Sequence, residues 1–242
     1  MRLFSSPQAA IRAVLVSQVV LAAAIVGLDL MQSPGKAAPG LFTPAPGGPA
    51  TRPYRPDMRP GTPGSPAMRP MADRLEFSAG DEVLRVSGQI APGDATRFLA
   101  WLEETRPEPG LVTLDSSGGS VSDALAIGDT IRSAGYRTKV EAGAVCLSAC
   151  PYILAAGVER SAAPGAVVGV HQSYFGKNTL LPAFMAVSDM QHAQANVMDY
   201  LTRMGIDLRL VMHALRTPPD EIRVLDAEEM RDLKLTTESS ES

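Results

Sequence analysis

Between residues 75 and 90, apolar positions alternate with polar ones on either side of a predicted turn at residues 79–81. Alternation with a period of two is typical of strands that bury one face, and a glycine among small and polar residues is typical of a turn. The pattern therefore predicts a pair of strands. From about Asp94 the apolar spacing changes to three and four residues, which predicts a helix that ends before Pro107.

Short apolar stretches then alternate with segments of helical spacing. A succession of strand, helix and strand in one direction is the pattern of repeated right-handed crossovers over a largely parallel sheet. The fold class predicted for residues 72–236 is therefore α/β with a mostly parallel sheet. The predicted strands cover residues 111–114, 138–140, 158–161 and 167–171, and the predicted helices cover 121–135, 148–157 and 182–204.

The amino terminus has a different pattern. Arg2 and Arg12 precede an almost uninterrupted apolar run over residues 13–28. A run of this length with no charge at its centre is typical of a membrane-targeting segment, and the preceding positive charge favours an amino terminus in the cytoplasm. We therefore predict that residues 1–31 are a signal anchor or a signal peptide. An uncleaved anchor that crosses the membrane through residues 13–30 is the favoured alternative.

Residues 32–71 have the composition of a tether. Eleven of the 20 prolines of the chain lie between Pro34 and Pro70, among glycine, alanine, threonine and serine. Such a stretch has too few apolar side chains to offset the entropy of ordering it, so it is predicted to be a disordered linker. A short disordered tail is predicted at residues 237–242, which leaves 72–236 as the folded domain.

Charge and cysteine content exclude some functions. The formal net charge of -4, without a basic stripe in the folded region, argues against nucleic acid as a partner. The two cysteines and scattered histidines do not have metal-ligand spacing, so no metal site and no cofactor are predicted. Outside the cytoplasm, Cys146 and Cys150 could form a disulfide, because a separation of four residues at a helix start places Cα atoms about 6 Å apart. The sequence leaves pairing open, since so short a loop gains little stability from it.

Pro151 restricts where its helix can begin. Proline is tolerated only in the first turn of a helix, so the helix is predicted to begin near Ser148. A serine at that place is often only an N-cap, but it also points a hydroxyl at the positive end of the helix dipole. Gly118 and Gly119, which follow another strand end, expose backbone amides at the same edge of a parallel sheet. Together these residues could form an anion-stabilising site.

Three segments in order resemble the ClpP-like branch of the ClpP and crotonase superfamily. Residues 115–119 (Asp-Ser-Ser-Gly-Gly) resemble its Asn-Ser-Pro-Gly-Gly turn, and residues 148–157 resemble its serine helix, which ends in Leu-Ala-Ala-Gly. Residues 170–172 (Val-His-Gln) resemble its histidine strand end. With the cysteine pair, the anchor and the tether, the chain is similar to periplasmic ClpP-like proteins of Gram-negative bacteria. The resemblance implies the repeated ββα crossovers of that superfamily.

The resemblance also implies roles for individual residues. Ser148 would be the nucleophile, and His171 its general base. The amides of Gly119 and Ala149 would hold the oxyanion, with Gly118 shaping the turn.

The third member of a triad is less well defined by the sequence. The position that aligns with the family's acid falls on Ile222, and the nearest carboxylates, Asp220 and Glu221, are one or two residues out of register. Two alternatives follow. Asp220, or else Glu221, reaches the histidine by a loop shift, or the site is a Ser-His dyad.

Three functions are compatible with these residues. The leading hypothesis is a serine hydrolase on the periplasmic side of the inner membrane, or free in the periplasm if the signal segment is cleaved. It would be a peptidase acting on peptides or proteins without ATP, because ATP is absent outside the inner membrane. The alternative is a catalytically silent ClpP-like binding or scaffold protein. A third class, acyl-CoA enzymes of the crotonase type, is disfavoured because coenzyme A is scarce outside the cytoplasm.

Self-association is a further expectation. The predicted helix over residues 182–204 carries several methionines at helical spacing. Such a stripe is typical of a core or of a contact between subunits. Relatives of this fold associate through a helix at this place, so a homo-oligomer is predicted.

Overall fold

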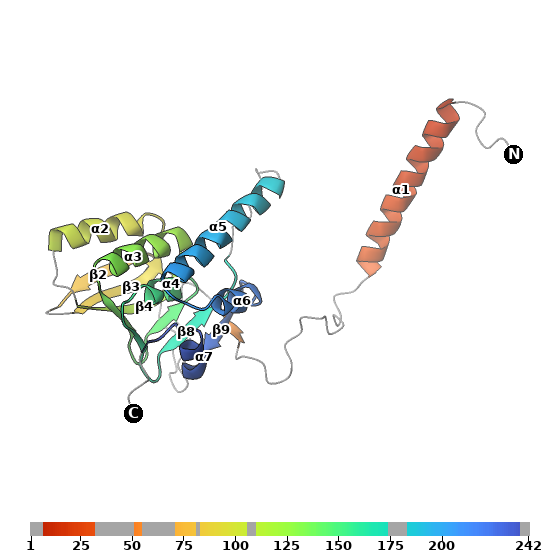
Figure 1. Cartoon of the computed structure of the whole chain (residues 1–242). Coiled ribbons are helices and arrows are strands. Elements are labelled where there is room, and N and C mark those ends of the chain that lie inside the picture. The colour runs from red at the N-terminus through yellow and green to blue at the C-terminus, as the bar shows by residue number, and fades with distance from the viewer. Residues whose placement is uncertain are drawn as a thin grey trace. The chain divides into compact units, whose positions relative to one another are not determined.

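The structure is a computed structural model that describes residues 7–31, 51–54, 71–80, 83–105, 110–173 and 183–237. The chain divides into two compact units, Met1–Gly48 and Pro49–Ser242. The described part of the first unit is one helix, α1 (Pro7–Met31) (Figure 1). Among the residues that the structure describes, no helix is both long enough and apolar enough to cross a membrane. The membrane segment at residues 13–30 stays a prediction.

The second unit is built on a sheet whose described strands are nine in number. They run in the order β1-β9-β8-β6-β4-β3-β2, and β5 branches from β4 and pairs with β7. The strands are β1 (Thr51–Pro53), β2 (Glu76–Ala79), β3 (Val83–Ile90), β4 (Leu111–Gly119), β5 (Arg137–Val140), β6 (Val145–Leu147), β7 (Arg160–Ala162), β8 (Val167–Val170) and β9 (Glu221–Leu225). The helices are α2 (Asp94–Thr105), α3 (Val121–Ser133), α4 (Cys150–Ala155), α5 (Ala183–Arg203), α6 (Arg209–Leu215) and α7 (Ala227–Asp232).

Strand directions confirm the mostly parallel α/β sheet. The pairs β3 with β4, β4 with β5, β4 with β6, β5 with β7, and β6 with β8 are all parallel. The predicted pair around residues 79–81 is the antiparallel hairpin of β2 and β3. The other antiparallel pairs join β8 to β9 and β9 to β1. At this edge of the sheet, β9 therefore runs antiparallel to both of its neighbours, β8 and β1. The crossover pattern did not predict these two antiparallel pairs.

Strand β4 divides between two partners. Residues 111–114 pair with β5, whereas Ser116 pairs with Cys146 of β6. The Asp115 carboxylate lies at the point of division and accepts a hydrogen bond of 3.1 Å from the amide of Val145, the first residue of β6. The sequence predicted only residues 111–114 of this strand and none of β6. Because β6 has three residues, all buried, it shows no alternation from which a strand could be predicted.

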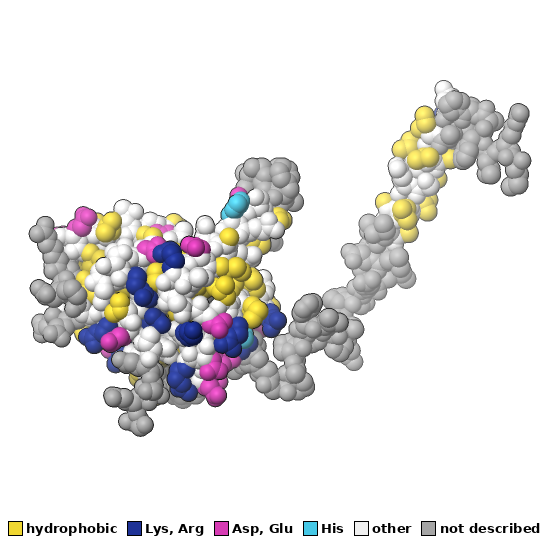
Figure 2. Space-filling view, viewed as in Figure 1, with side chains coloured by type: hydrophobic (Ala, Val, Ile, Leu, Met, Phe, Trp, Pro, Cys, Tyr) yellow, Lys and Arg dark blue, Asp and Glu magenta, His cyan; other side chains and the backbone are white. Residues whose placement is uncertain are grey.

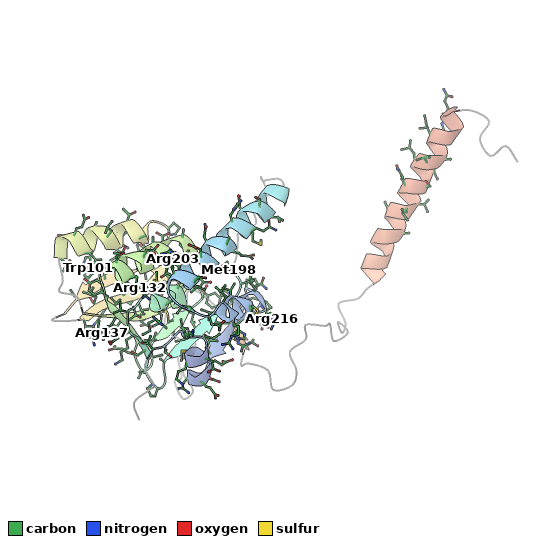
Figure 3. The ribbon with its side chains drawn as sticks, in the orientation of Figure 1. Trp101, Arg132, Arg137, Met198, Arg203 and Arg216 are labelled. Carbon is green, nitrogen blue, oxygen red and sulfur yellow. A yellow bond between two sulfur atoms is a disulfide. The ribbon has the colours of Figure 1, made fainter. Side chains whose placement is uncertain are left out.

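Two arginines hold the end of α4, the helix that follows Ser148. Arg132, on α3, donates to the carbonyls of Ala155 and Ala156 at 3.1 and 2.7 Å (labelled in Figure 3). Arg160 donates to the carbonyl of Gly157 at 3.0 Å. The last carbonyls of a helix have no partner within it and carry partial negative charge, so cations are favourable there. The short helix α4 is thereby fixed at its far end.

Helix α5 is fixed to the same region. The Tyr200 hydroxyl donates to the carbonyl of Tyr152 on α4 at 2.8 Å, and Arg203 pairs with Asp129 of α3 at 2.8 Å (Figure 3). The opposite end of α5 extends away from the sheet (Figure 1), and its Val187 is 52% exposed. Figure 2 shows apolar side chains gathered at the base of α5 beside α6. Self-association through α5 stays a prediction.

Residues 51–54 are a correction to the linker prediction. Thr51 pairs with Arg223 and Pro53 with Glu221, so β1 extends the sheet at β9. The disordered linker predicted over residues 32–71 is therefore wrong at residues 51–54, because the edge of β9 supplies backbone partners that composition cannot reveal. It is also wrong at Met71, which is buried in an apolar cluster with Ile222. The rest of 32–70 lies outside the described residues, as does 238–242 of the predicted tail. Thr237 is held by backbone and side-chain hydrogen bonds to Arg160.

Candidate active site

Ser148 lies in a strained turn between β6 and α4. Its φ of 60° is in the left-handed region, which costs a non-glycine residue about 1 to 2 kcal/mol. The helix begins at Cys150 with Ala149 as its N-cap, so Ser148 precedes the helix and is not the cap that its position near Pro151 suggested. A sharp turn between a strand and a helix holds a serine hydroxyl out at the edge of the sheet, where it can react.

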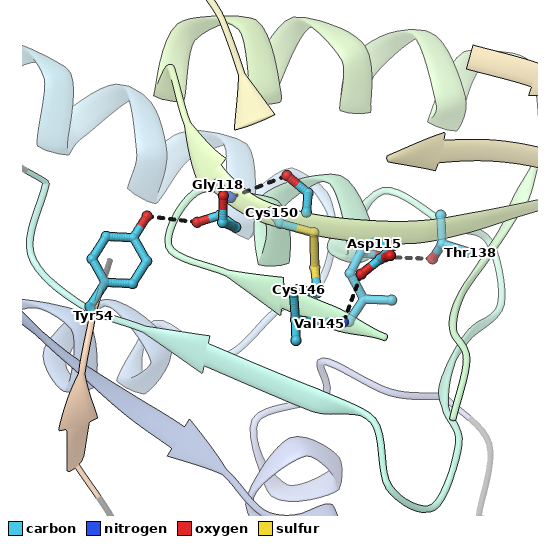
Figure 4. The surroundings of a disulfide bond; sticks show 10 residues. Tyr54, Asp115, Gly118, Thr138, Val145, Cys146 and Cys150 are labelled. Carbon is cyan, nitrogen blue, oxygen red and sulfur yellow. Dashed lines mark hydrogen bonds between the residues drawn. A yellow bond between two sulfur atoms is a disulfide. The ribbon is translucent and has the colours of Figure 1, made fainter. Parts of the chain in front are cut away.

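A disulfide spans this turn. Cys146, in β6, is joined to Cys150, the first residue of α4, and their Cα atoms are 5.0 Å apart (Figure 4). Both cysteines are fully buried. The cross-link lies on the buried side of the turn and leaves Ser148 on the wall of a cavity. It therefore constrains the serine without covering it.

His171 directly follows β8 and meets the serine. Its Nε2 lies 2.7 Å from Ser148 Oγ, and its Nδ1 lies 3.0 Å from the carbonyl oxygen of Pro219. A carbonyl can only accept a hydrogen bond, so Nδ1 carries the proton and Nε2 is left to accept from the serine hydroxyl. Burial lowers the pKa of His171, against the opposing effect of the Pro219 and Pro218 carbonyls. The imidazole is therefore neutral at neutral pH, as a general base must be.

The predicted acid is not the partner of His171 in the structure. Asp220 is exposed at the cavity, and its carbonyl accepts from the amide of Tyr54, while Glu221 begins β9. The aligned position, Ile222, is fully buried in a small apolar cluster. The turn before β9 thus presents a backbone carbonyl to the imidazole. Of the two alternatives that the sequence left open, the described geometry has the form of the Ser-His dyad.

The glycine turn packs directly against the serine. A Cβ on Gly118, whose φ is 93°, would lie 2.5 Å from the Cβ of Ser148 and 2.4 Å from the carbonyl oxygen of Leu147. The Gly118 amide donates to the Ser116 hydroxyl at 3.1 Å (Figure 4). Gly119 lines the cavity with Ser148, and the amide of Ala149 belongs to the residue after the serine. The structure thus brings together both segments that the sequence assigned to an oxyanion hole.

Tyr54 is a site residue that the sequence reasoning missed. Its ring centroid lies 4.4 Å from that of His171, and its hydroxyl donates to the carbonyl of Ser117 at 2.6 Å. Its proline-rich segment has the composition of an unfolded tether, which does not indicate that a strand carries Tyr54 to the site. A signal was present, because Tyr54 is the one aromatic residue between Phe42 and Phe77.

The site opens into a cavity of about 1020 Å³. Helices α3, α5 and α6 supply an apolar wall that includes Leu125, Val197 and Leu215. The charged side chains among the described lining residues are Asp129 and Asp220, and none of these residues is a lysine or arginine. Within the described part of the chain, no group of histidine, cysteine, aspartate and glutamate side chains could hold a metal ion. Because Asp129 is paired with Arg203, the cavity is mostly apolar, with the exposed carboxylate of Asp220 at its wall.

Comparison with known protein families gives a match. The family model for Clp protease matches residues 82–207, which include Ser148, His171 and the glycine turn. The match ends before Pro219 and begins after Tyr54. None of the curated proteins matches the chain.

The packing of Gly118 predicts that a methyl group there disrupts the turn. Gly118→Ala should lower the free energy of unfolding by about 3 kcal/mol, because overpacking adds to the left-handed strain. Gly165→Ala is the matched control: φ is 84° and a Cβ would meet nothing within 4 Å, so the loss should be only about 1 kcal/mol. Chemical denaturation measures both. Equal losses would show that Gly118 does not pack against Ser148 as described.

The disulfide gives a second prediction. Replacing both cysteines, as Cys146→Ala with Cys150→Ala, should lower the free energy of unfolding by about 2 kcal/mol, since the cross-link closes a five-residue loop. It should also slow labelling of Ser148 by a fluorophosphonate probe, because the turn loses one of its constraints. Denaturant titration and the labelling rate are the two measurements. A double variant that matches the unmodified protein in both would exclude a constraining role for the disulfide.

Proposed function

Because the chain belongs to the Clp protease family, we propose that it is a serine hydrolase that cleaves peptide bonds through a Ser148–His171 dyad. The observation that carries this proposal is the 2.7 Å contact between Ser148 Oγ and His171 Nε2 on the wall of a large cavity. A nucleophile within hydrogen-bond distance of a base that is itself oriented by a third group is the arrangement that acyl transfer requires. Here the orienting group is the Pro219 carbonyl.

The first half of the proposed reaction forms an acyl-enzyme. Ser148 Oγ attacks the carbonyl carbon of the substrate, and its proton passes to Nε2 of His171. The Pro219 carbonyl holds the proton on Nδ1 and is favourably placed for the positive charge that the imidazole then carries. The backbone amides of Ala149 and Gly119 donate hydrogen bonds to the oxyanion of the tetrahedral intermediate and stabilise its negative charge. Such a donor typically lowers the barrier by about 3 to 4 kcal/mol.

The second half returns the site to its starting state. His171 gives its proton to the leaving amine, and the bond between carbonyl carbon and nitrogen breaks, which leaves the acyl group on Ser148. Water then attacks the ester, with His171 again as the base, and releases the acid product. Neither half requires ATP or a bound cofactor.

The cavity supports a peptide or protein substrate with an apolar side chain beside the scissile bond. The wall formed by α3, α5 and α6 is mostly apolar. Its Asp129 is paired with Arg203, and the exposed Asp220 lines the cavity from the turn before β9. An acidic side chain placed there would lose hydration without gaining a lysine or arginine partner among the described lining residues, and it would be repelled by Asp220. Large anionic groups such as a nucleotide phosphate are disfavoured on the same ground.

We place this hydrolase at the inner membrane, anchored through residues 13–30, with the folded domain in the periplasm. Two observations support this location. Arg2 and Arg12 precede the apolar run over residues 13–28, a charge order that is typical of a membrane-targeting segment. The disulfide between Cys146 and Cys150 is of a kind that persists in an oxidising compartment. Self-association through α5 is part of the same proposal.

One observation favours a second candidate, a catalytically silent binding protein. The Nδ1 partner of His171 is a neutral carbonyl instead of a carboxylate. A carbonyl still selects the reactive tautomer, but it offers less stabilisation to the imidazolium than a negative charge would. Both candidates use the same cavity, so they differ only in whether Ser148 reacts.

Replacement of the nucleophile distinguishes the two candidates. In the full-length protein, Ser148→Ala should abolish fluorophosphonate labelling and lower peptide hydrolysis at least 1000-fold, because no covalent intermediate can form. The matched control is Ser133→Ala, an exposed serine at the end of α3, which should leave both unchanged. Hydrolysis that survives Ser148→Ala would refute the proposed mechanism. An unmodified protein that neither labels nor hydrolyses would favour the silent binding protein.

Substrate preference can be tested with a matched pair of peptides. Two fluorogenic peptides that differ only by leucine or aspartate before the scissile bond should differ in kcat/KM by at least 10-fold in favour of leucine. The cause is the apolar wall and the negative charge of Asp220. Measurement at low and high salt separates the effects, because only the charge repulsion is screened. Equal kcat/KM values would contradict this assignment of the cavity.

A further inference from the structure

Tyr54 contacts three separate parts of the site. Its ring packs on the imidazole of His171 with centroids 4.4 Å apart. Its hydroxyl donates to the carbonyl of Ser117, at the start of the glycine turn, at 2.6 Å (Figure 4). Its backbone amide donates to the carbonyl of Asp220 at 3.0 Å, in the turn that also supplies the Pro219 carbonyl. One side chain and its backbone therefore join the base, the partner of the base and the glycine turn.

The contact between Tyr54 and His171 matters because a neutral hydrogen bond holds Nδ1 of the imidazole. A carboxylate would fix an imidazole strongly through its charge, but here Nδ1 bonds to a neutral carbonyl. The orientation of the ring therefore depends more on what packs against its face. Tyr54 supplies that face, and its hydrogen bond to Asp220 steadies the turn on which the Pro219 carbonyl lies.

The chemistry of Tyr54 fits a fixed position in the site. Burial raises the pKa of the Tyr54 hydroxyl, against a smaller opposing effect of a hydrogen bond with Ser148. The phenol is therefore protonated at neutral pH and can donate to Ser117. The ring also keeps water from one side of His171, which is itself only 6% exposed.

Strand β1 determines where Tyr54 lies. Residues 51–53 pair in antiparallel register with β9, and the chain leaves this strand directly into Tyr54. The register between Pro53 and Glu221 carries the tyrosine to the end of the sheet at which His171 follows β8. The segment lies outside the Clp protease match over residues 82–207, so the match alone does not assign it a role.

We propose that Tyr54 is a positioning residue for His171, which it orients through the face of the imidazole while its hydroxyl holds the glycine turn at Ser117. This role rests on the proposed hydrolase function. The ring maintains the contact between Nε2 and Ser148 Oγ and keeps the imidazole dehydrated. The N-terminal strand β1 is thus part of the active site.

Charged groups around His171 also affect its pKa, which is the quantity that tests this role. Arg223, on the neighbouring strand β9, lies opposite Val170 but is paired with Glu229. Arg209, the first residue of α6, is paired with Asp207. The other basic groups of this helix are His213 and Arg216, its C-cap residue. The ring of Tyr54 is the group that contacts the imidazole face. The titratable side chains that line the cavity with His171 are Tyr54, Asp129, Tyr152 and Asp220.

The test compares Tyr54→Ala, Tyr54→Phe and Thr51→Ala in the full-length protein. NMR titration of the imidazole signals gives the pKa of His171, with His192 and His213, the other two histidines of the chain, as internal references. Tyr54→Ala should raise the pKa of His171 toward the ordinary value of about 6.5, because the imidazole becomes hydrated. Tyr54→Phe keeps the ring and should leave this pKa unchanged, as should Thr51→Ala, an exposed change on β1.

Kinetics give the second readout. A raised pKa of His171 means that more of the base is protonated at a given pH, so the acid limb of kcat/KM should move to higher pH in Tyr54→Ala. At the plateau, kcat should fall by about 30-fold to 100-fold with little change in KM, since a slightly misplaced base costs about two orders of magnitude. Tyr54→Phe should restore the acid limb and most of kcat.

The outcomes separate this role from the proposed function. If Tyr54→Ala leaves both the pKa of His171 and kcat unchanged, Tyr54 is only a packing residue and the proposal is overturned. If Ser148→Ala retains hydrolysis, the proposed function fails, whereas the NMR titration still tests whether Tyr54 controls His171. If Tyr54→Ala unfolds, Tyr54→Leu preserves apolar bulk without the flat ring that orients the imidazole, so kcat should fall with little change in KM. An unchanged kcat in Tyr54→Leu would also overturn the proposal.

Discussion

The left-handed turn at Ser148 is the constraint on which the rest of the site depends. A serine with φ of 60° is stable only if the structure around it leaves no alternative, and three features do this here. Strand β6 holds the turn from one side, and the disulfide from Cys146 to Cys150 spans it. Gly118 packs against it so closely that no side chain would fit. The far end of α4 is held in turn by Arg132 and Arg160. The strain at one residue is thus offset by the order of its whole neighbourhood.

The base is held in a different way. His171 follows β8, a buried strand that is parallel to β6, and this strand determines how deeply the imidazole is buried. The orientation of the imidazole depends on β9 and β1, the two strands that join the sheet in antiparallel pairs. The turn before β9 supplies the Pro219 carbonyl, and β1 supplies Tyr54. Both lie outside the residues matched by the Clp protease family. The nucleophile and glycine turn therefore belong to the family core, whereas the groups that orient the base come from segments on either side of it. This arrangement gives a base whose Nδ1 bonds to a backbone carbonyl and whose pKa is lowered by burial.

Prediction from sequence succeeded where one periodic pattern covered enough residues. The hairpin of β2 and β3, the helices α2 and α3, and the strand β8 all followed from apolar spacing. It failed for β6, which is too short and too buried to alternate, and for β1, whose proline-rich composition is typical of unfolded chain. The position of Ser148 was nearly right, but a helix start from Pro151 could not reveal the left-handed turn two residues before the helix. The acid at Asp220 or Glu221 was inferred from register, and register could not show that the turn presents a carbonyl.

By itself, the sequence determined the α/β class, the order of its crossovers, and the segments that carry the serine, the histidine and the paired glycines. These features depend on the spacing of apolar residues, on the restricted backbone of proline and on the permissive backbone of glycine. All three can be recognised from residues that are close together in the sequence. Only the tertiary structure decided which groups meet them. The pairing of β1 with β9 brings Tyr54 to His171 across 117 residues of chain, and the turn at Pro219 reaches the same ring from 48 residues away. Contacts between such distant segments depend on strand register and packing, and the spacing of apolar residues within either segment does not predict them.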